Sequence, residues 1–240
     1  MNRTKINWAD YTWNPITGCT KIAQGCKNCY AEVMFKRLSK MSKKYKGRTF
    51  NDVKFHPDVL NDPKLKSKKA LRIFVDSMGD IFHEKISDDH IRQILDVIKD
   101  NPQHTFLVLT KRIKRATDWN LSTLKNLWLG YSASTQTDLI KGVDDLFRTN
   151  ARIKWLSLEP LIGSIDLFSA NCINIDWIVV GVESGNKRRP CYLTWIREIV
   201  KDCKENDIPV WVKQLEIKDV VTDNINDFPE DLRIRELPNV

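Results

Sequence analysis

The sequence predicts an α/β fold and, within that class, a (β/α) TIM-type barrel, complete or partial. Short and nearly continuous apolar runs recur along the chain, and helix-like segments separate them. Apolar runs of this kind are typical of parallel strands buried on both faces. The length of 240 residues suits a single barrel domain. A doubly wound open sheet is the alternative for the same pattern.

Six apolar runs predict the clearest strands, at residues 72–77, 105–110, 127–132, 153–158, 175–181 and 208–213. Two weaker runs, residues 11–16 and 53–56, bring the expected set to eight. Because strands and helices alternate, we expect parallel strands joined by right-handed crossovers. The tryptophans inside these runs, Trp128, Trp155, Trp177 and Trp211, are expected in the core.

Amphipathic patterns predict the helices between the strands. Ser87 is a typical N-cap, acidic residues follow it in the first turn, and Ile91, Ile94, Leu95 and Ile98 recur at helical spacing. Residues 193–206 form a second segment of this kind. We assign residues 1–215 to one barrel domain that includes an N-terminal cysteine loop. Residues 216–240 lack strong periodicity and are expected to form a peripheral C-terminal extension.

Three cysteines lie close together after the first expected strand, in the run Gly18-Cys19-x6-Cys26-x2-Cys29-Tyr30. Structural zinc sites and most iron–sulfur clusters use four protein ligands, so three thiols indicate a metal centre with one open position. The helix expected from Tyr30 would place Cys29 at its N-terminus, where the helix dipole favours a thiolate. A zinc site completed by a distant histidine (His56 or His83, less favourably His90 or His104) and three unrelated thiols remain alternatives.

Polar residues stand where most of the apolar runs end. They are Asp76, Ser77, Thr110, Lys111, Ser132, Ser157, Glu159, Glu183, Ser184, Lys213 and Gln214. In a (β/α) barrel, the working groups lie at the carboxyl ends of the strands. For any single residue, capping of the strand end is the simpler interpretation. Their recurrence on most strands predicts a polar active-site mouth shared with the cysteine loop.

Positive charge is concentrated in one part of the chain. Residues 36–69 contain twelve Lys or Arg against three Asp, a balance of +9, whereas the whole chain carries +8 and the remainder therefore −1. Such a segment suits a polyanion, and we expect DNA or RNA as its partner. A solvated lysine-rich surface is the simpler alternative.

The chain shows no targeting segment. Its first residues contain no apolar signal-peptide core, and no run approaches 18 apolar residues. We therefore expect a cytoplasmic protein with no membrane association. In that compartment six cysteines indicate reduced, metal-bound or catalytic thiols rather than disulfides.

The cysteine motifs resemble those of a phage- and prophage-associated three-cysteine-motif family, which is radical-SAM-like and of largely unknown function. The resemblance is carried by Trp-Asn-Pro-Ile-Thr-Gly-Cys (13–19) and Gly-Cys-Lys-Asn-Cys-Tyr-Ala-Glu (25–32), and it continues through residues 74–83, 109–112, 128–130, 158–161, 180–185 and 212–214. It spans residues 8–214. The chain departs from the commonest superfamily pattern in its six-residue first gap and in Asn28, where an aromatic residue is usual.

The resemblance implies a [4Fe-4S] cluster held by Cys19, Cys26 and Cys29, with S-adenosyl-L-methionine (SAM) at the open iron. It implies metal-binding and radical-SAM chemistry, in which an electron donor reduces the cluster and the cleaved SAM abstracts hydrogen from a substrate. Zinc is the alternative metal. On this interpretation Asp76, Ser77, Ser132, Ser157 and Glu159 bind SAM.

The same resemblance implies catalytic roles for Glu183, Lys111 and Lys213 toward the substrate or the methionine carboxylate. Cys191 would return a hydrogen atom to a substrate radical, and an incidental loop cysteine is the alternative. The expected function is an iron–sulfur enzyme acting on nucleic acid or a nucleotide, in DNA repair or base modification. The alternative is a zinc- or cluster-stabilised nucleic-acid-binding phage accessory protein without catalysis.

Overall fold

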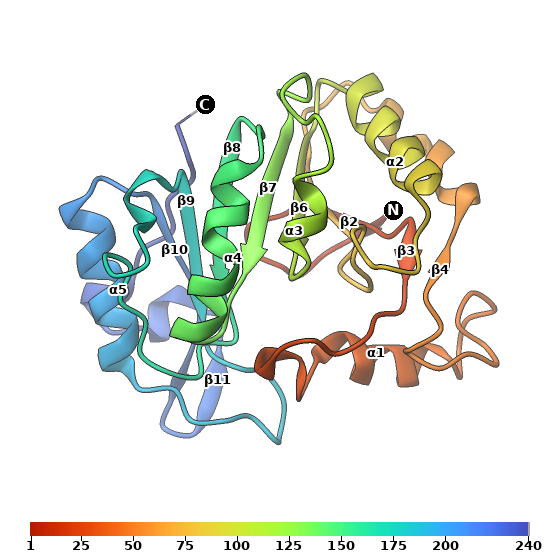
Figure 1. The fold of residues 1–240 in the computed structure, drawn as a ribbon. Coiled ribbons are helices and arrows are strands. Elements are labelled where there is room, and N and C mark those ends of the chain that lie inside the picture. The colour runs from red at the N-terminus through yellow and green to blue at the C-terminus, as the bar shows by residue number, and fades with distance from the viewer. Residues whose placement is uncertain (240) are drawn as a thin grey trace.

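A computed structural model describes residues 1–239 and shows a mixed α/β fold built on one mostly parallel sheet (Figure 1). The sheet has nine strands, in the order β1 (Asn2–Arg3), β2 (Tyr11–Trp13), β5 (Arg72–Val75), β6 (Thr105–Thr110), β7 (Leu127–Ser132), β8 (Ile153–Leu158), β9 (Trp177–Gly181), β10 (Val210–Ile217) and β11 (Val220–Thr222). The strands from β2 to β10 pair in parallel, and β1 and β11 add antiparallel edges.

The sheet is open, so a closed barrel is not formed by the described residues. The sheet stays open because two of the eight expected strands differ from the prediction. The run 11–16 is interrupted at Asn14-Pro15 and gives β2 and a separate β3 (Ile16–Thr17), because proline cannot donate to a strand ladder. The run 53–56 gives only β4 (Lys54–Phe55), which pairs antiparallel with β3 in a small second sheet. The main sheet therefore lacks an eighth parallel strand.

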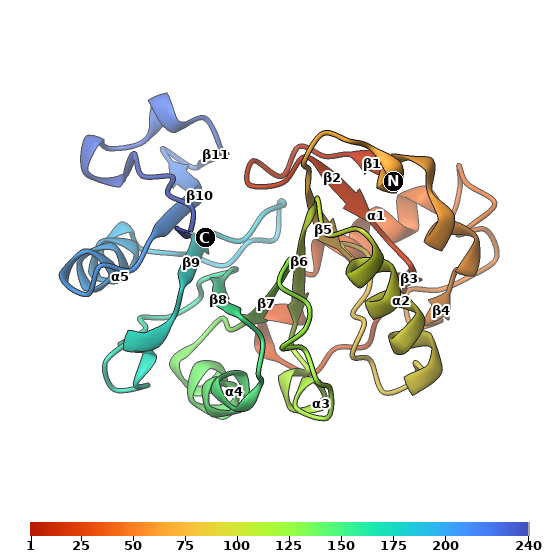
Figure 2. The same cartoon turned by 90° about the horizontal axis from the view of Figure 1, so that it is seen from above.

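Most of the helices lie on the outer side of the curved sheet, as Figure 2 shows. They are α2 (Asp88–Asp100), α3 (Ile113–Ala116), α4 (Gln136–Arg148) and α5 (Leu193–Glu205), while α1 (Tyr30–Leu38) follows the cysteines. Short 3-10 helices occur at residues 24–26, 57–61, 63–66, 172–174, 225–227 and 230–232. Among these elements no helix has the length and apolarity needed to cross a membrane.

The predicted cap of α2 is present. The Ser87 Oγ accepts a hydrogen bond from the His90 N–H at 3.3 Å, and Ile91, Ile94 and Ile98 are buried against the sheet. Thr135 caps α4 in the same way, accepting from the Asp138 N–H at 3.1 Å. Apolar stripes at helical spacing therefore predicted α2 and α5 with their packing faces, whereas α4, which is equally long, was not predicted from the sequence.

The two faces of the sheet carry different cores because side chains alternate along each strand. In β5, Ile73 and Val75 pack into the large core that also contains the helix residues. Phe74 points to the opposite, inner face, into a cluster dominated by tryptophans: Trp8, Trp128, Trp155, Trp177 and Trp211. The core position predicted for the strand tryptophans is confirmed. The doubly wound alternative would need helices over this inner face, whereas an aromatic cluster covers it.

The C-terminal segment packs against the same core as the rest of the chain. The boundary expected at residue 215 falls inside β10, which continues to Ile217 and pairs with β11. Beyond it, Phe228 and Leu232 are fully buried in the main core. The Trp177 Nε1–H donates to the Glu236 carbonyl at 2.8 Å, so residues 216–239 help to enclose the inner face as well.

Candidate functional site

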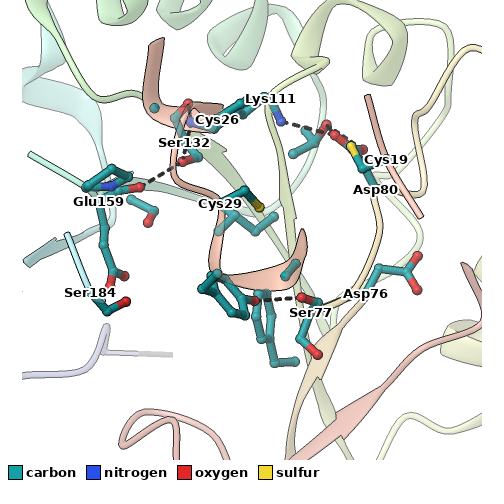
Figure 3. A pocket seen from close by; sticks show the side chains of 18 of the residues that line it. Cys19, Cys26, Cys29, Asp76, Ser77, Asp80, Lys111, Ser132, Glu159 and Ser184 are labelled. Atoms are coloured by element: carbon teal, nitrogen blue, oxygen red, sulfur yellow. Dashed lines mark hydrogen bonds between the residues drawn. The ribbon is translucent and has the colours of Figure 1, made fainter. Parts of the chain in front are cut away.

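A pocket of about 310 Å³ lies at the carboxyl ends of the parallel strands, above the inner aromatic cluster. Its floor includes Trp8, Phe74 and Leu109. Figure 3 shows the three cysteines of the N-terminal loop beside the polar ends of several strands. The residues given a ligand, SAM-binding or catalytic role line this pocket, except Cys191: Cys19, Cys26, Cys29, Asp76, Ser77, Lys111, Ser132, Ser157, Glu159, Glu183 and Lys213. Of the other strand-end residues, Thr110 and Ser184 also line it, whereas Gln214 does not and donates to the Val182 carbonyl at 2.7 Å.

Glycines allow the cysteine loop to pass close to the rest of the protein. Gly18 has a φ of +92°, and a Cβ at this position would lie 2.6 Å from the Asp52 carbonyl oxygen. A Cβ on Gly25 would lie 2.1 Å from the Ser134 Oγ. Both positions require a residue without a side chain. Cys29 is the N-cap residue of α1, as the sequence predicted.

Arg112 holds the first cysteine in place. Its guanidinium donates to the Cys19 Sγ at 3.4 Å, to Glu84 at 2.7 Å and to the Thr20 carbonyl at 3.1 Å. Asp80 lies beneath it and accepts from the Thr110 hydroxyl at 2.8 Å. The sequence pattern predicted a site role for neither Arg112 nor Asp80. Both lie in segments that carry the family resemblance, residues 109–112 and 74–83, and that resemblance was the available signal.

Burial controls the thiols. Desolvation raises the pKa of Cys19 to about 12, and the neighbouring Asp80 carboxylate acts in the same direction. Desolvation also raises the pKa of Cys29, against the backbone N–H groups of Glu32 and Ala31, which lower it. These thiols are therefore protonated in the metal-free protein, and binding of a metal would release protons.

The donor set at the pocket fits a thiolate-bound metal in its chemistry. Within residues 1–239, no group of three or more His, Cys, Asp or Glu side chains is gathered closely enough to hold a metal ion. The three thiols nevertheless share one pocket, and the charge of Cys26 acts on both Cys19 and Cys29. Thiolates are the ligands preferred by iron–sulfur clusters and by zinc.

Among the described residues 1–239, no histidine lines the pocket alongside the cysteines. His83 is fully buried; its Nδ1 accepts from the Lys85 N–H at 3.1 Å, and its Nε2 faces the Thr20 hydroxyl at 2.9 Å. His56 pairs with the Thr17 hydroxyl at 2.8 Å. His56 and His83, the two histidines favoured as a fourth zinc ligand, are thus hydrogen-bonded to other groups. The less favoured two also lie outside the pocket lining: the His104 Nε2 lies 3.0 Å from the Leu65 carbonyl, and the His90 ring stacks on Phe55.

Asp76 is the least satisfied side chain of the site. It has a φ of +56° in the left-handed region, and its Oδ1 accepts from the Ile16 N–H at 2.8 Å. Its Oδ2 is buried and has no hydrogen-bond partner among the described residues. Desolvation raises the pKa of this carboxyl well above its usual value. A buried carboxyl with a free acceptor and a strained backbone is a feature of binding sites.

Lys111 places a cation beside the cysteines. Its Nζ donates to the Ser132 Oγ at 2.9 Å and to the Ser132 carbonyl at 3.1 Å, and no carboxylate of the described chain pairs with it. Desolvation lowers its pKa, while negative charge at Cys26 would raise it. A charged Lys111 is therefore favoured by an anionic group at the thiols.

Other predicted binding residues are engaged within the protein. Glu159 forms an ion pair with Lys213 across the pocket. The Ser77 Oγ donates to the Asn14 Oδ1 at 3.1 Å, and the Ser132 Oγ donates weakly to the Glu159 carbonyl at 3.4 Å. Ser157 lines the pocket at the end of β8. A ligand at these groups would exchange one hydrogen bond for another.

Glu183 is buried and is bound by Arg189, which donates from its backbone N–H at 2.8 Å and from its guanidinium. Burial acts to raise the pKa of Glu183, but the hydrogen bonds from Arg189 and Asn28 outweigh it and the net pKa is lowered. Cys191 is partly buried against the main core, and desolvation raises its pKa to about 12. The site thus contains Glu183 as an ionised anchor and does not contain Cys191.

Comparison with known proteins identifies a family but no characterised relative. A family model described as "Protein of unknown function (DUF5131)" matches residues 3–224. No curated protein matches the chain. No solved structure matches it either.

Proposed function

The chain belongs to the DUF5131 family of unknown function, and we propose that it is an iron–sulfur enzyme of the radical-SAM type that acts on nucleic acid or a nucleotide. One observation carries the proposal. Three thiols from an eleven-residue stretch share a pocket with polar groups from the six successive strands β5 to β10, at the edge where parallel sheets bind ligands. Cys19, Cys26 and Cys29 would hold a [4Fe-4S] cluster, and SAM would occupy the pocket beside it.

When bound, the reduced cluster and SAM supply a carbon radical that abstracts hydrogen from the substrate. The residues that line the pocket would bind the cluster and SAM, orient the substrate and enclose the reacting groups. Lys111 and Arg112 balance negative charge at the thiols, and the apolar floor around Trp8 and Phe74 keeps water from the reacting centre. The unpaired Oδ2 of Asp76 offers a ligand one hydrogen-bonding position. An electron donor is required as a partner.

The finer fold assignment belongs to the same proposal. The parallel strands β2 and β5 to β10 curve around an inner core and carry their helices outside, as in a partial (β/α) barrel (Figure 2). We also assign the protein to the cytoplasm, because the six cysteines are free thiols and a reducing compartment keeps them so.

Basic groups at the pocket rim support a polyanionic substrate. Lys27 and Lys187 are exposed on the two loops beside the pocket, and within residues 1–239 neither forms an ion pair. Lys36, Arg37 and Lys40 add exposed cations along α1 and its C-terminal end. Phosphates of DNA or RNA would bind such groups.

The decisive experiment is anaerobic purification and reconstitution with iron and sulfide, followed by dithionite and SAM. We expect close to four irons per chain, on the cluster stoichiometry, and release of 5′-deoxyadenosine. Single Cys→Ala changes at Cys19, Cys26 or Cys29 should abolish both. Cys203→Ala, a change at a buried thiol far from the pocket lining, should retain both.

Two outcomes would defeat the proposal. Stoichiometric zinc that iron does not replace supports a zinc-stabilised binding protein, and a stable cluster that never cleaves SAM supports a structural or redox-sensing centre.

The substrate is tested by anisotropy with DNA and RNA oligonucleotides. Lys27→Glu with Lys187→Glu should lower the affinity and reduce the salt slope by roughly 2. Lys99→Glu with Lys141→Glu, on α2 and α4, is the control pair. It should change the salt slope by less than about 20% of the change that the Lys27 and Lys187 pair produces.

A further inference from the structure

The cysteine loop and the loop after β9 come from opposite ends of the open sheet, yet they meet beside the pocket. Asn28, between the second and third cysteines, is the residue that joins them. Its Nδ2 donates to the Glu183 Oε2 at 3.0 Å and to the Lys187 carbonyl at 2.8 Å. Arg189 adds a second link, donating to the Gln24 carbonyl at 2.9 Å.

Glu183 is the fixed point of this contact. It is 3% exposed and lies two residues after β9; the Arg189 guanidinium forms an ion pair with it, and the Arg189 backbone N–H donates to it. A hydrogen bond to an ionised and buried acceptor is among the stronger kinds in proteins. Asn28 therefore anchors the two-residue turn between Cys26 and Cys29 to the segment that follows β9.

We propose that Asn28 is a positioning residue that holds the turn between Cys26 and Cys29 at the pocket through the anchored carboxylate of Glu183. The turn has other restraints, since Arg189 donates to the Gln24 carbonyl and Lys21 donates to the Lys27 carbonyl at 3.1 Å. Asn28 is the side chain of the turn that binds a buried group, whereas the Cys26 and Cys29 side chains are only partly buried. The role of Glu183 is then to place the cysteines rather than to react with substrate. The contact itself exists whatever the thiols bind, and only its use in catalysis depends on the proposed function.

The test measures the reactivity of each thiol in the metal-free, reduced protein with iodoacetamide and mass spectrometry. Asn28→Asp replaces the donor with a second carboxylate facing Glu183. We expect Cys26 and Cys29 to be alkylated about tenfold faster, because a lost charge-assisted hydrogen bond increases local opening by that order. Cys172 and Cys203, which are fully buried, report global unfolding and should not change.

A swapped pair distinguishes positioning from general damage. Asn28→Asp combined with Glu183→Gln restores one donor and one acceptor in reversed order, and the rates at Cys26 and Cys29 should return to within about twofold of the native protein. Asn186→Asp is the matched control, since Asn186 is exposed in the same loop and makes none of these contacts.

Equal rates in Asn28→Asp and Asn186→Asp would overturn the proposal. So would a double variant no slower than Asn28→Asp, because the contact between positions 28 and 183 would then not be the cause. The measurement needs neither metal nor SAM. A protein that shows these rates but never assembles a cluster would retain the positioning role and lose the proposed enzyme function.

Discussion

At the scale of single residues, Asp76 has two features that lower the stability of the fold. A non-glycine residue at positive φ and a buried carboxyl oxygen without a partner both cost stability. Neighbouring Ser77 and Asp80 have hydrogen-bond partners within the protein. The cost at Asp76 is therefore local and is consistent with a group kept for a ligand.

Asp76→Asn should stabilise the protein increasingly as the pH rises. The folded-state pKa of this acid lies above its ordinary value of 3.8, so the folded protein binds more protons than the unfolded chain above that pH. Its penalty accordingly grows with pH until the folded-state pKa is passed. Asparagine keeps the acceptor for the Ile16 N–H and tolerates positive φ, but it carries no charge.

Thermal unfolding at about pH 5 and about pH 8 measures this effect. We expect the gain in Tm of Asp76→Asn to be larger at the higher pH by at least about 2–4 °C, the shift that 1 kcal/mol produces in a chain of this size. Asp96→Asn, at an exposed position on α2, is the control and should show no such trend. A pH-independent gain would mean that Asp76 titrates normally.

At the scale of elements, the close packing of β7 against β8 depends on a glycine that leaves room for a tryptophan ring. The two strands pair in parallel with Gly130 opposite Trp155. A Cβ on Gly130 would lie 2.3 Å from the Trp155 ring, which is fully buried in the inner cluster. The ring is packed edge-on against Trp8 and tilted against Trp177, so a methyl group at position 130 would have to displace a buried ring.

Gly130→Ala should therefore destabilise the protein by about 1–3 kcal/mol, the range for overpacked cores. Urea unfolding followed by tryptophan fluorescence reports directly on the inner cluster. Gly163→Ala is the matched control, because nothing lies within 4 Å of a Cβ at that position. If both variants unfold at the same urea concentration, the inner face is less tightly packed than the structure shows.

At the scale of the whole molecule, side chains close the gap that the missing strand leaves. Asn7, between β1 and β2, accepts from the Trp211 Nε1–H at 2.9 Å and donates to the Lys213 carbonyl at 3.1 Å, both on β10. Asn28 bridges the same two sides beside the pocket. Two asparagines thus join the first and last parts of a sheet whose strands do not meet.

Asn7→Ala should cost about 1–3 kcal/mol, because the nearly buried indole N–H of Trp211 would lose its acceptor. The free energy of unfolding in urea measures the loss. Asn186→Ala, at an exposed loop position, should lie within about 0.5 kcal/mol of the native protein. An equally small effect of Asn7→Ala would show that the packing of Trp8 alone closes the inner face.

Local patterns were sufficient for much of the molecule. Apolar runs predicted the central strands, and the serine cap with its isoleucine stripe predicted α2, because burial on a helix or a two-sided strand imposes a period on the sequence. The strand-end rule also brought the cysteines and Lys111, Glu159 and Lys213 to one pocket. These features depend on neighbours in sequence or on the shared edge of a parallel sheet.

By itself the sequence determined the α/β class, the positions along the chain of the main parallel strands, and the cysteines and polar residues that lie at the carboxyl edge of the sheet. Only the tertiary structure decided that β4 leaves the main sheet, that Glu183 is occupied by Arg189 and Asn28, and that Cys191 lies away from the pocket. Each of these depends on a contact between residues far apart in the chain. A periodic pattern in the sequence does not predict such contacts. Asn28 and Glu183 lie about 150 positions apart, and the packing of the folded chain, not the local pattern, brings them together.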